Sequence, residues 1–194
     1  MRTMHIQISI LLFATLAFAH GPALAVETAP TSADVAAAYA AIPHQRTQFD
    51  ASSSTAPTNQ KADLARLFAY TDRGIVLRVR GMQAQGAKDA AEVRRVGAGY
   101  EDLIAGLRKE KFSSEIAPAQ ALILDALHLH QRHLQSRPEG GLVFVRQQIS
   151  TVPEVKEAHG KLVRAYDILM RAFPGETQRN KTSFYDHLCA LDFL

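Results

Sequence analysis

Histidine is the residue type with the most chemical potential in this chain. Six of the eight histidines lie beyond residue 25, namely His44, His128, His130, His133, His159 and His187. A neutral imidazole can bind a transition metal or haem iron, and it can also carry a proton near neutral pH. Three of the six share one predicted helix, at spacings of two, three and five rather than the four that stacks two side chains one turn apart.

Two histidines occupy positions where an apolar side chain is expected. His130 continues the stripe formed by Ile123, Leu127 and Leu134, and His159 does the same in the following long helix. Imidazoles on the inner faces of two helices can meet inside a bundle. A single histidine on such a stripe more often donates one hydrogen bond to a carbonyl at the bundle edge, and that is the interpretation we favour.

A metal or haem site is the sharper alternative for these two core-facing histidines. His130 and His159 would supply imidazole nitrogens, and Met82 and Met170 would add soft thioether sulfur. The alternative cofactor is therefore a transition metal or haem. Under the favoured interpretation we expect no cofactor.

Residues 43–50 form the second group with recognisable chemistry. They follow the first predicted helix and place His44, Arg46 and Phe49 close together in sequence. The guanidinium of Arg46 can fork onto a carboxylate or a phosphate. The favoured interpretation is a packed connection in which Phe49 holds the segment against the core. The alternative is a loop that contacts a ligand or a partner.

A third candidate is a basic helix face. Arg73 and Arg80 are spaced by seven residues, so they share one face of a predicted helix, and Arg66 lies seven residues earlier. Such a face is most often simply solvated. The sharper hypothesis is that it binds an acidic partner or an anionic polymer of the cell envelope.

No familiar catalytic motif is present. The chain contains no G-x-S-x-G, H-E-x-x-H, C-x-x-C, P-loop or G-x-G-x-x-G sequence. The single cysteine, Cys189, is interpreted as a small apolar residue of the last helix, with an intermolecular disulfide or a reactive thiol as alternatives. His187 lies two residues before it, but that is proximity in sequence only. An enzyme would need a site that only the fold assembles.

The first 25 residues have the order of a secretory signal. Arg2 is followed by an apolar run of 11 residues from Ile8 to Phe18, and the small residues Ala23 and Ala25 stand where a signal peptidase reads. A membrane-spanning helix needs about 20 apolar residues. We therefore predict cleavage after Ala25, a periplasmic or secreted protein, and no transmembrane segment in the mature chain.

The mature chain has the composition of one exported domain. Removing the first 25 of 194 residues leaves 169, and loss of Arg2 lowers the formal charge from +3 to +2. That length is sufficient for a single buried core. No run of Lys and Arg with interleaved aromatics is present, so nucleic acid is excluded as the expected partner.

Helices must position all of these groups, because alternating strand patterns are scarce while apolar residues recur at spacings of three and four. We predict an all-α protein, a four-helix-type bundle with short accessory helices at both ends. Residues 26–31 are predicted to be a disordered tail and residues 32–194 a single helical domain. The predicted helices span 33–42, 59–85, 88–109, 113 or 114 to 136, 142–150, 153–173 and 176–191.

The first functional hypothesis follows from this pattern. A well-patterned bundle without a catalytic motif indicates an exported, non-enzymatic protein that binds a protein or a component of the cell envelope. The first alternative is the metal- or haem-binding bundle. The second is an enzyme whose site is not visible in the sequence.

Overall fold

The protein is an all-helical bundle. The computed structural model describes residues 29–136 and 152–192, and every regular element in those ranges is a helix. The all-α class and the bundle with accessory helices are confirmed. None of the described helices is both long and apolar enough to cross a membrane. The helices are α1 Ser32–Ala40, α2 Thr58–Gly86, α3 Ala90–Lys109, α4 Ala117–Gln135, α6 Pro153–Ala172 and α7 Gln178–Asp192.

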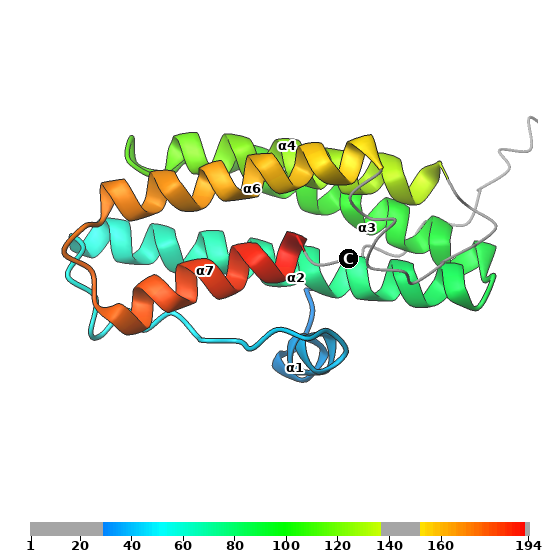
Figure 1. Cartoon of the computed structure of the whole chain (residues 1–194), viewed down its shortest axis with the longest axis horizontal. Coiled ribbons are helices and arrows are strands. Elements are labelled where there is room, and N and C mark those ends of the chain that lie inside the picture. Colours follow the sequence, from blue (N-terminus) through cyan, green and yellow to red (C-terminus); the bar gives the residue numbers. More distant parts are fainter. Residues whose placement is uncertain (1–28, 137–151, 193–194) are drawn as a thin grey trace, which may run out of the picture.

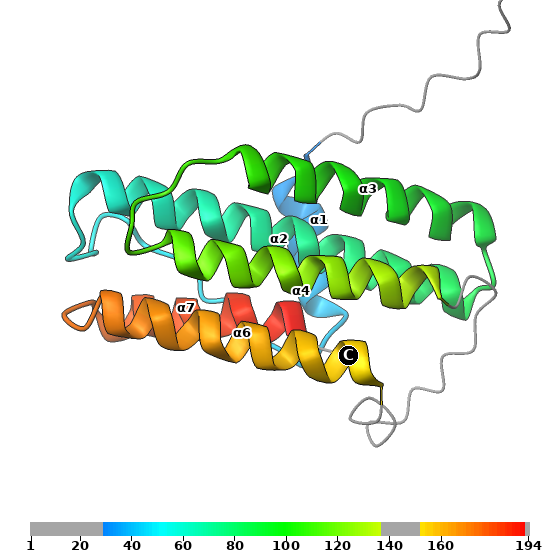
Figure 2. The ribbon, with the colours of Figure 1, turned by 90° about the horizontal axis from the view of Figure 1, so that it is seen from above.

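Five helices run alternately up and down along one long axis. Helix α2 packs against α3 and α7, α3 packs against α4, and α6 packs against both α4 and α7. Figures 1 and 2 show this antiparallel arrangement, with α1 lying across the outside of the bundle. Antiparallel neighbours are expected where the helix connections are short.

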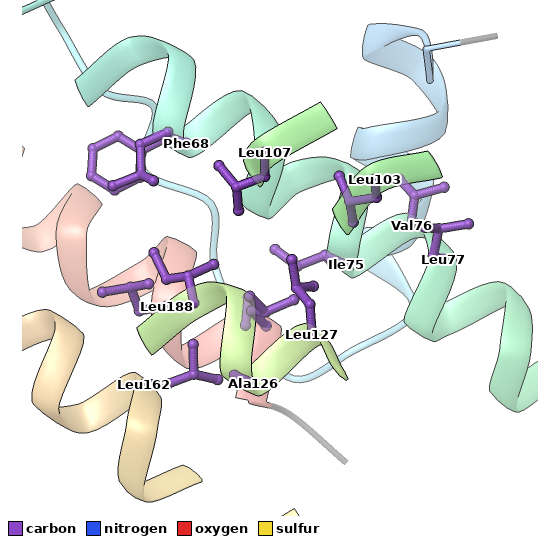
Figure 3. Packing of buried hydrophobic residues seen from close by; sticks show 14 of the residues in the cluster. Phe68, Ile75, Val76, Leu77, Leu103, Leu107, Ala126, Leu127, Leu162 and Leu188 are labelled. Atoms are coloured by element: carbon purple, nitrogen blue, oxygen red, sulfur yellow. The ribbon is translucent and has the colours of Figure 1, made fainter. Parts of the chain in front are cut away.

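The core lies where apolar residues recur along each helix. Figure 3 shows side chains of α2, α3, α4, α6 and α7 meeting at the centre, among them Phe68, Leu107, Leu127, Leu162 and Leu188. All five are buried. Burying one such side chain contributes about 1.5–3 kcal/mol to folding. The pattern at spacings of three and four therefore accounts for the bundle.

Two glycines let neighbouring helices approach α2. A Cβ atom on Gly74 would lie 2.8 Å from Leu191 Cδ1 and 3.0 Å from Leu127 Cδ2. A Cβ atom on Gly81 would lie 3.0 Å from Leu134 Cδ1. The backbone of α2 thus serves as a contact surface for α4 and α7.

Helix ends depart from the predicted bounds by a few residues. Helix α1 begins at Ser32, and Thr31 caps it in a reciprocal capping box with Asp34. Helix α4 starts at Ala117, after Ser113 has entered a turn and donated its backbone N–H to Asp63 at 2.8 Å. The helix predicted over 142–150 lies outside the described residues, as does the signal segment.

An extended connection joins α1 to α2. Residues 43–56, called the strap below, contain no helix and run along the bundle before α2 begins. Figure 1 shows this connection passing beside α7 and α2 toward the N-terminal end of α2. The strap carries His44, Arg46 and Phe49, so its contacts decide what these residues do.

Candidate functional site

Asp72 of α2 anchors the start of the strap. Arg46 donates a hydrogen bond from Nη2 to Asp72 Oδ2 at 2.7 Å, and Tyr39 donates its hydroxyl to Oδ1 at 3.2 Å. His187 Nε2 lies 3.5 Å from the same Oδ1 atom. Asp72 is only 7% exposed. The guanidinium of Arg46 is therefore engaged by a buried carboxylate of the protein itself.

Helix α7 holds the middle of the strap. The Thr47 backbone N–H donates to Asp186 Oδ2 at 3.0 Å. The Asp50 backbone N–H donates to Asn180 Oδ1 at 2.9 Å, and Asn180 Nδ2 donates back to the Asp50 carbonyl at 3.0 Å. These side chains satisfy backbone groups that no helix or sheet would otherwise pair.

Phe49 fixes the strap through aromatic packing. Its ring centroid lies 5.7 Å from that of Phe68 on α2 and 6.3 Å from that of Phe184 on α7. Aromatic pairs at such separations contribute about 0.5–1.5 kcal/mol beyond the area that they bury. The arrangement is that of a packed connection, with Phe49 directed into the core.

His44 approaches the single cysteine. The two residues are far apart in sequence, yet Cys189 Sγ lies 3.9 Å from His44 Nε2. Burial raises the pKa of the Cys189 thiol; a hydrogen bond with Tyr185 acts in the opposite direction, and the nearby Asp192 carboxylate raises it again. The thiol is therefore protonated at neutral pH, unlike an activated nucleophile.

The predicted basic face is balanced by acidic neighbours. Arg80 contacts Glu92 Oε1 at 2.7 Å, and Glu92 also pairs with Arg95 at 2.7 Å. Arg66 pairs with Asp63 at 2.6 Å. Arg73 is half-buried. The described part of α2 therefore does not present an isolated stripe of positive charge.

A small pocket lies between α2, α3 and α4. Its volume is about 30 Å³, and His130 of α4 is one of its walls. His130 is 4% exposed, and neither ring nitrogen has a hydrogen-bond partner among the described residues. Buried polar side chains nearly always have partners, so this imidazole requires an explanation. The lining residues are Leu77, Arg78, Gly81, Met82, Gln85, Tyr100, His130, His133 and Leu134.

A buried positive charge lies near His130. Burial holds its pKa well below the usual 6.5, and the Arg78 guanidinium and His133 lower it further. Arg78 is itself buried on α2, which lowers its pKa to about 10, and it remains charged at neutral pH. Its Nη2 donates to the Asp192 carbonyl at 3.3 Å. His130 is consequently neutral and sits beside a fixed cation.

The predicted metal ligands separate into different places. Met82 lines the same pocket as His130. His159 has a side chain 60% exposed and bonds through Nδ1 to the Asp192 carboxylate. Met170 is partly buried near the C-terminal end of α6, at the opposite end of the bundle from the C-terminal part of α2 (Figure 1). Within residues 29–136 and 152–192, no group of three His, Cys, Asp or Glu side chains is arranged to hold a metal ion.

The expectation that His159 faces the core is wrong, because the inner face of α6 is formed by other residues. The inner face of α6 includes two alanines, which a search for large apolar residues overlooks. His159 and Val163 each follow an inner-face residue by one position, a rotation of about 100° around the helix. Both are exposed. The buried α6 residues are Val155, Ala158, Leu162, Ala165 and Leu169.

Sequence reasoning did not identify Arg78, Tyr100 and His133 as neighbours of His130. Arg78 lies between apolar residues of α2, four residues before Met82. A charged residue inside an apolar stretch is the sequence feature that could have identified it as a pocket residue. Only the packing of α2, α3 and α4 brings the three to one pocket.

No protein-family model, curated protein or solved structure matches this chain.

Proposed function

We propose that this protein is an exported, non-enzymatic helical bundle that binds a small ligand in the pocket around His130. The observation that carries the proposal is the buried imidazole of His130, whose two nitrogens lack partners among the described residues. A ligand that hydrogen-bonds this imidazole offsets the cost of burying it, which is about 1–3 kcal/mol.

The lining of the pocket supports binding rather than catalysis. The described residues that line it include no carboxylate, no serine or threonine hydroxyl and no thiol. Cys189 does not line the pocket, and its thiol pKa is raised. Acid–base chemistry at His130 would require a pKa near the working pH, whereas the pKa of this imidazole is far below its usual value.

Export is supported by the leader pattern of residues 1–25. The direct measurement is the intact mass and N-terminal sequence of protein recovered from the native compartment. We expect a chain that starts at Val26. A chain that retains the apolar run would contradict the export part of the proposal.

Ligand binding is tested by observing His130 directly. Protein labelled with ¹⁵N at histidine is titrated separately with sodium bromide, sodium formate, zinc(II) and copper(I), and the ring nitrogens are followed by long-range ¹H–¹⁵N correlation. We expect at least one probe to shift the His130 resonances in a saturable way. The variant His130→Gln removes that response.

His128→Gln is the matched control, because His128 is on the same helix but bonds Arg108 at 2.9 Å and does not line the pocket. This variant keeps the saturable response. If none of the four probes shifts His130 saturably, the proposed binding function is wrong.

A further inference from the structure

We propose that Asp72 is the centre of an acid-sensitive latch, in which Arg46 of the strap and protonated His187 of α7 compete for one carboxylate, so that acid loosens α1 and the start of the strap from the bundle. The latch consists of Asp72, Arg46, His187 and Tyr39. None of these residues lines the His130 pocket. The latch therefore works independently of ligand binding at that pocket.

One buried carboxylate joins three elements to α2. Arg46 Nη2 lies 2.7 Å from Asp72 Oδ2. The Tyr39 hydroxyl and His187 Nε2 lie 3.2 Å and 3.5 Å from Asp72 Oδ1. The exposed fraction of the side chain is 29% for Arg46, 10% for Asp72 and 2% for His187. The guanidinium therefore lies at the outer edge of the latch, where it can move into water, while the imidazole is covered.

The hydrogen bond at the other ring nitrogen fixes the proton of neutral His187. Its Nδ1 lies 2.9 Å from the Ser183 carbonyl oxygen, which can only accept, so Nδ1 carries the hydrogen. Nε2 of the neutral ring is then an acceptor that faces the Asp72 carboxylate, which is also an acceptor. A second proton turns Nε2 into a charged donor. Protonation therefore creates a charge-assisted hydrogen bond to a carboxylate that Arg46 already binds.

The groups around His187 act on it in opposite directions. Burial is the largest influence and lowers its pKa below 6.5, and the Arg46 guanidinium lowers it as well. The Asp72 and Asp186 carboxylates and the hydrogen bond to the Ser183 carbonyl raise the pKa. The imidazole is therefore neutral at neutral pH. Its protonation at lower pH brings two cations to one carboxylate, where they repel each other.

Both influences that lower the His187 pKa depend on α1 and the strap. Arg46 belongs to the strap, and the Tyr39 ring of α1 packs edge-on to the imidazole with the centroids 6.4 Å apart. Burial raises the pKa of Tyr39, so its hydroxyl adds no charge. Phe68 of α2, with its centroid 4.7 Å away, is also uncharged. If α1 and Arg46 move away, the imidazole gains water and loses a neighbouring cation, so its pKa rises.

Proton linkage gives the direction of the response. The attached state has the lower His187 pKa, so the detached state binds more protons below about pH 6.5. The contribution of this group to attachment is fully present above that pH and is lost as the pH falls through the pKa of the attached state. Asp72 does not become an unpaired buried charge on detachment, because the imidazolium takes the place of Arg46.

Other contacts hold the rest of the strap. Asp50 exchanges hydrogen bonds with Asn180, and Phe49 packs against the core. Neither contact involves the Asp72 carboxylate. The segment that acid loosens is therefore α1 together with residues 43–46. Figure 1 shows α1 on the outside of the bundle, where it can detach while the five long helices stay packed.

Hydrogen–deuterium exchange of the purified protein, followed by mass spectrometry at about pH 7.5 and about pH 5.5, tests the latch on both sides of the usual histidine pKa. Rates are corrected for the intrinsic effect of pH on amide exchange. We expect peptides from α1 to exchange at least about threefold faster at the lower pH, because one linked proton changes an opening equilibrium up to about tenfold per pH unit. Peptides from α3 should show no such change.

Two variants assign the response to the latch. His187→Gln keeps a side-chain donor but does not titrate, so it abolishes the acid response of α1. His159→Gln is the matched control, because His159 also pairs with a carboxylate, that of Asp192, but has a side chain 60% exposed. This control keeps the response. Arg46→Gln loosens α1 at both pH values and raises the pKa of His187, which the NMR signal of its ring Cε1 proton measures.

Three outcomes overturn the inference. Equal corrected exchange of α1 at both pH values excludes the acid response, and this measurement needs no substitution if a variant fails to fold. A response that persists in His187→Gln belongs to another group. An unchanged His187 pKa in Arg46→Gln excludes competition for Asp72. The probe titrations of His130 are unaffected by each of these outcomes, so the latch and the proposed binding function fail separately.

Discussion

Arg78 and His130 face one pocket from α2 and α4, and the guanidinium helps to keep the imidazole neutral. The arrangement places a fixed buried cation beside a base that has no partner among the described residues. The imidazole does not stabilise the fold, because burying polar atoms that lack hydrogen-bond partners costs free energy. A group that opposes folding at this position is expected to have another role.

His130→Leu should stabilise the protein. Leucine fills a similar volume without polar atoms, so the free energy of unfolding should rise by about 1 kcal/mol. Urea denaturation at neutral pH measures the change. The matched control is His187→Leu, because His187 is also buried but bonds the Ser183 carbonyl at 2.9 Å and lies near Asp72. That variant should lose about 1–3 kcal/mol. A loss of stability in His130→Leu would show that the imidazole supports the fold.

Gly74→Ala should destabilise the bundle. Its added methyl group would lie 2.8 Å from Leu191 Cδ1 and 3.0 Å from Leu127 Cδ2, so these buried leucine side chains must move, at a cost of about 1–3 kcal/mol. Gly160→Ala is the control, because nothing lies within 4 Å of the added atom on exposed α6 surface. It should gain about 0.5–1 kcal/mol from helix propensity. Thermal unfolding measures the stability of both variants. Equal changes in stability would contradict the close approach of α4 and α7 to α2.

Glu176 should make the free energy of unfolding depend on pH in the acid range. Burial alone would raise its pKa, but hydrogen bonds from Ser54, Thr55 and Thr177 outweigh it and lower the pKa below 4.5. A carboxyl with a lowered folded-state pKa stabilises the protein above its unfolded pKa, and this stability is lost as the pH falls through the folded pKa. The free energy of unfolding should therefore decline from about pH 5 downward.

Glu176→Gln isolates that contribution. The variant should be less stable at neutral pH, and the difference from the unaltered protein should shrink in acid. Urea denaturation across the pH series measures both effects. Glu157→Gln, at an exposed position of α6, should leave the profile unchanged. A constant difference at all pH values would show that the Glu176 charge has no part in holding the strap.

Cys189 should react slowly with thiol reagents. Burial is the main cause that raises its pKa above 9.0, so little thiolate exists at neutral pH. Alkylation by iodoacetamide should be slower than that of a free thiol peptide and should accelerate only above about pH 9. His44→Ala should leave the rate at neutral pH unchanged. Rapid alkylation that depends on His44 would instead favour the enzymatic alternative.

Local patterns predicted the helices well because each pattern is set by near neighbours. Spacings of three and four located α2, α3 and α6 within a few residues of their observed ends. The same method failed on the orientation of His159, because Ala158 and Ala165 form part of the inner face of α6 and small residues carry little periodic signal. The delayed start of α4 depended on Asp63, which belongs to another helix.

The amino-acid sequence by itself determined the helical class, the apolar faces, the absence of familiar catalytic motifs and the prediction of export. These depend on residue type and short-range spacing. Tertiary structure alone decided which polar groups meet. In the folded chain Arg46 bonds Asp72, His159 is exposed, and Arg78 lines the same pocket as His130. Side chains far apart in sequence meet only through helix packing, and their charge and burial then set the chemistry of the pocket.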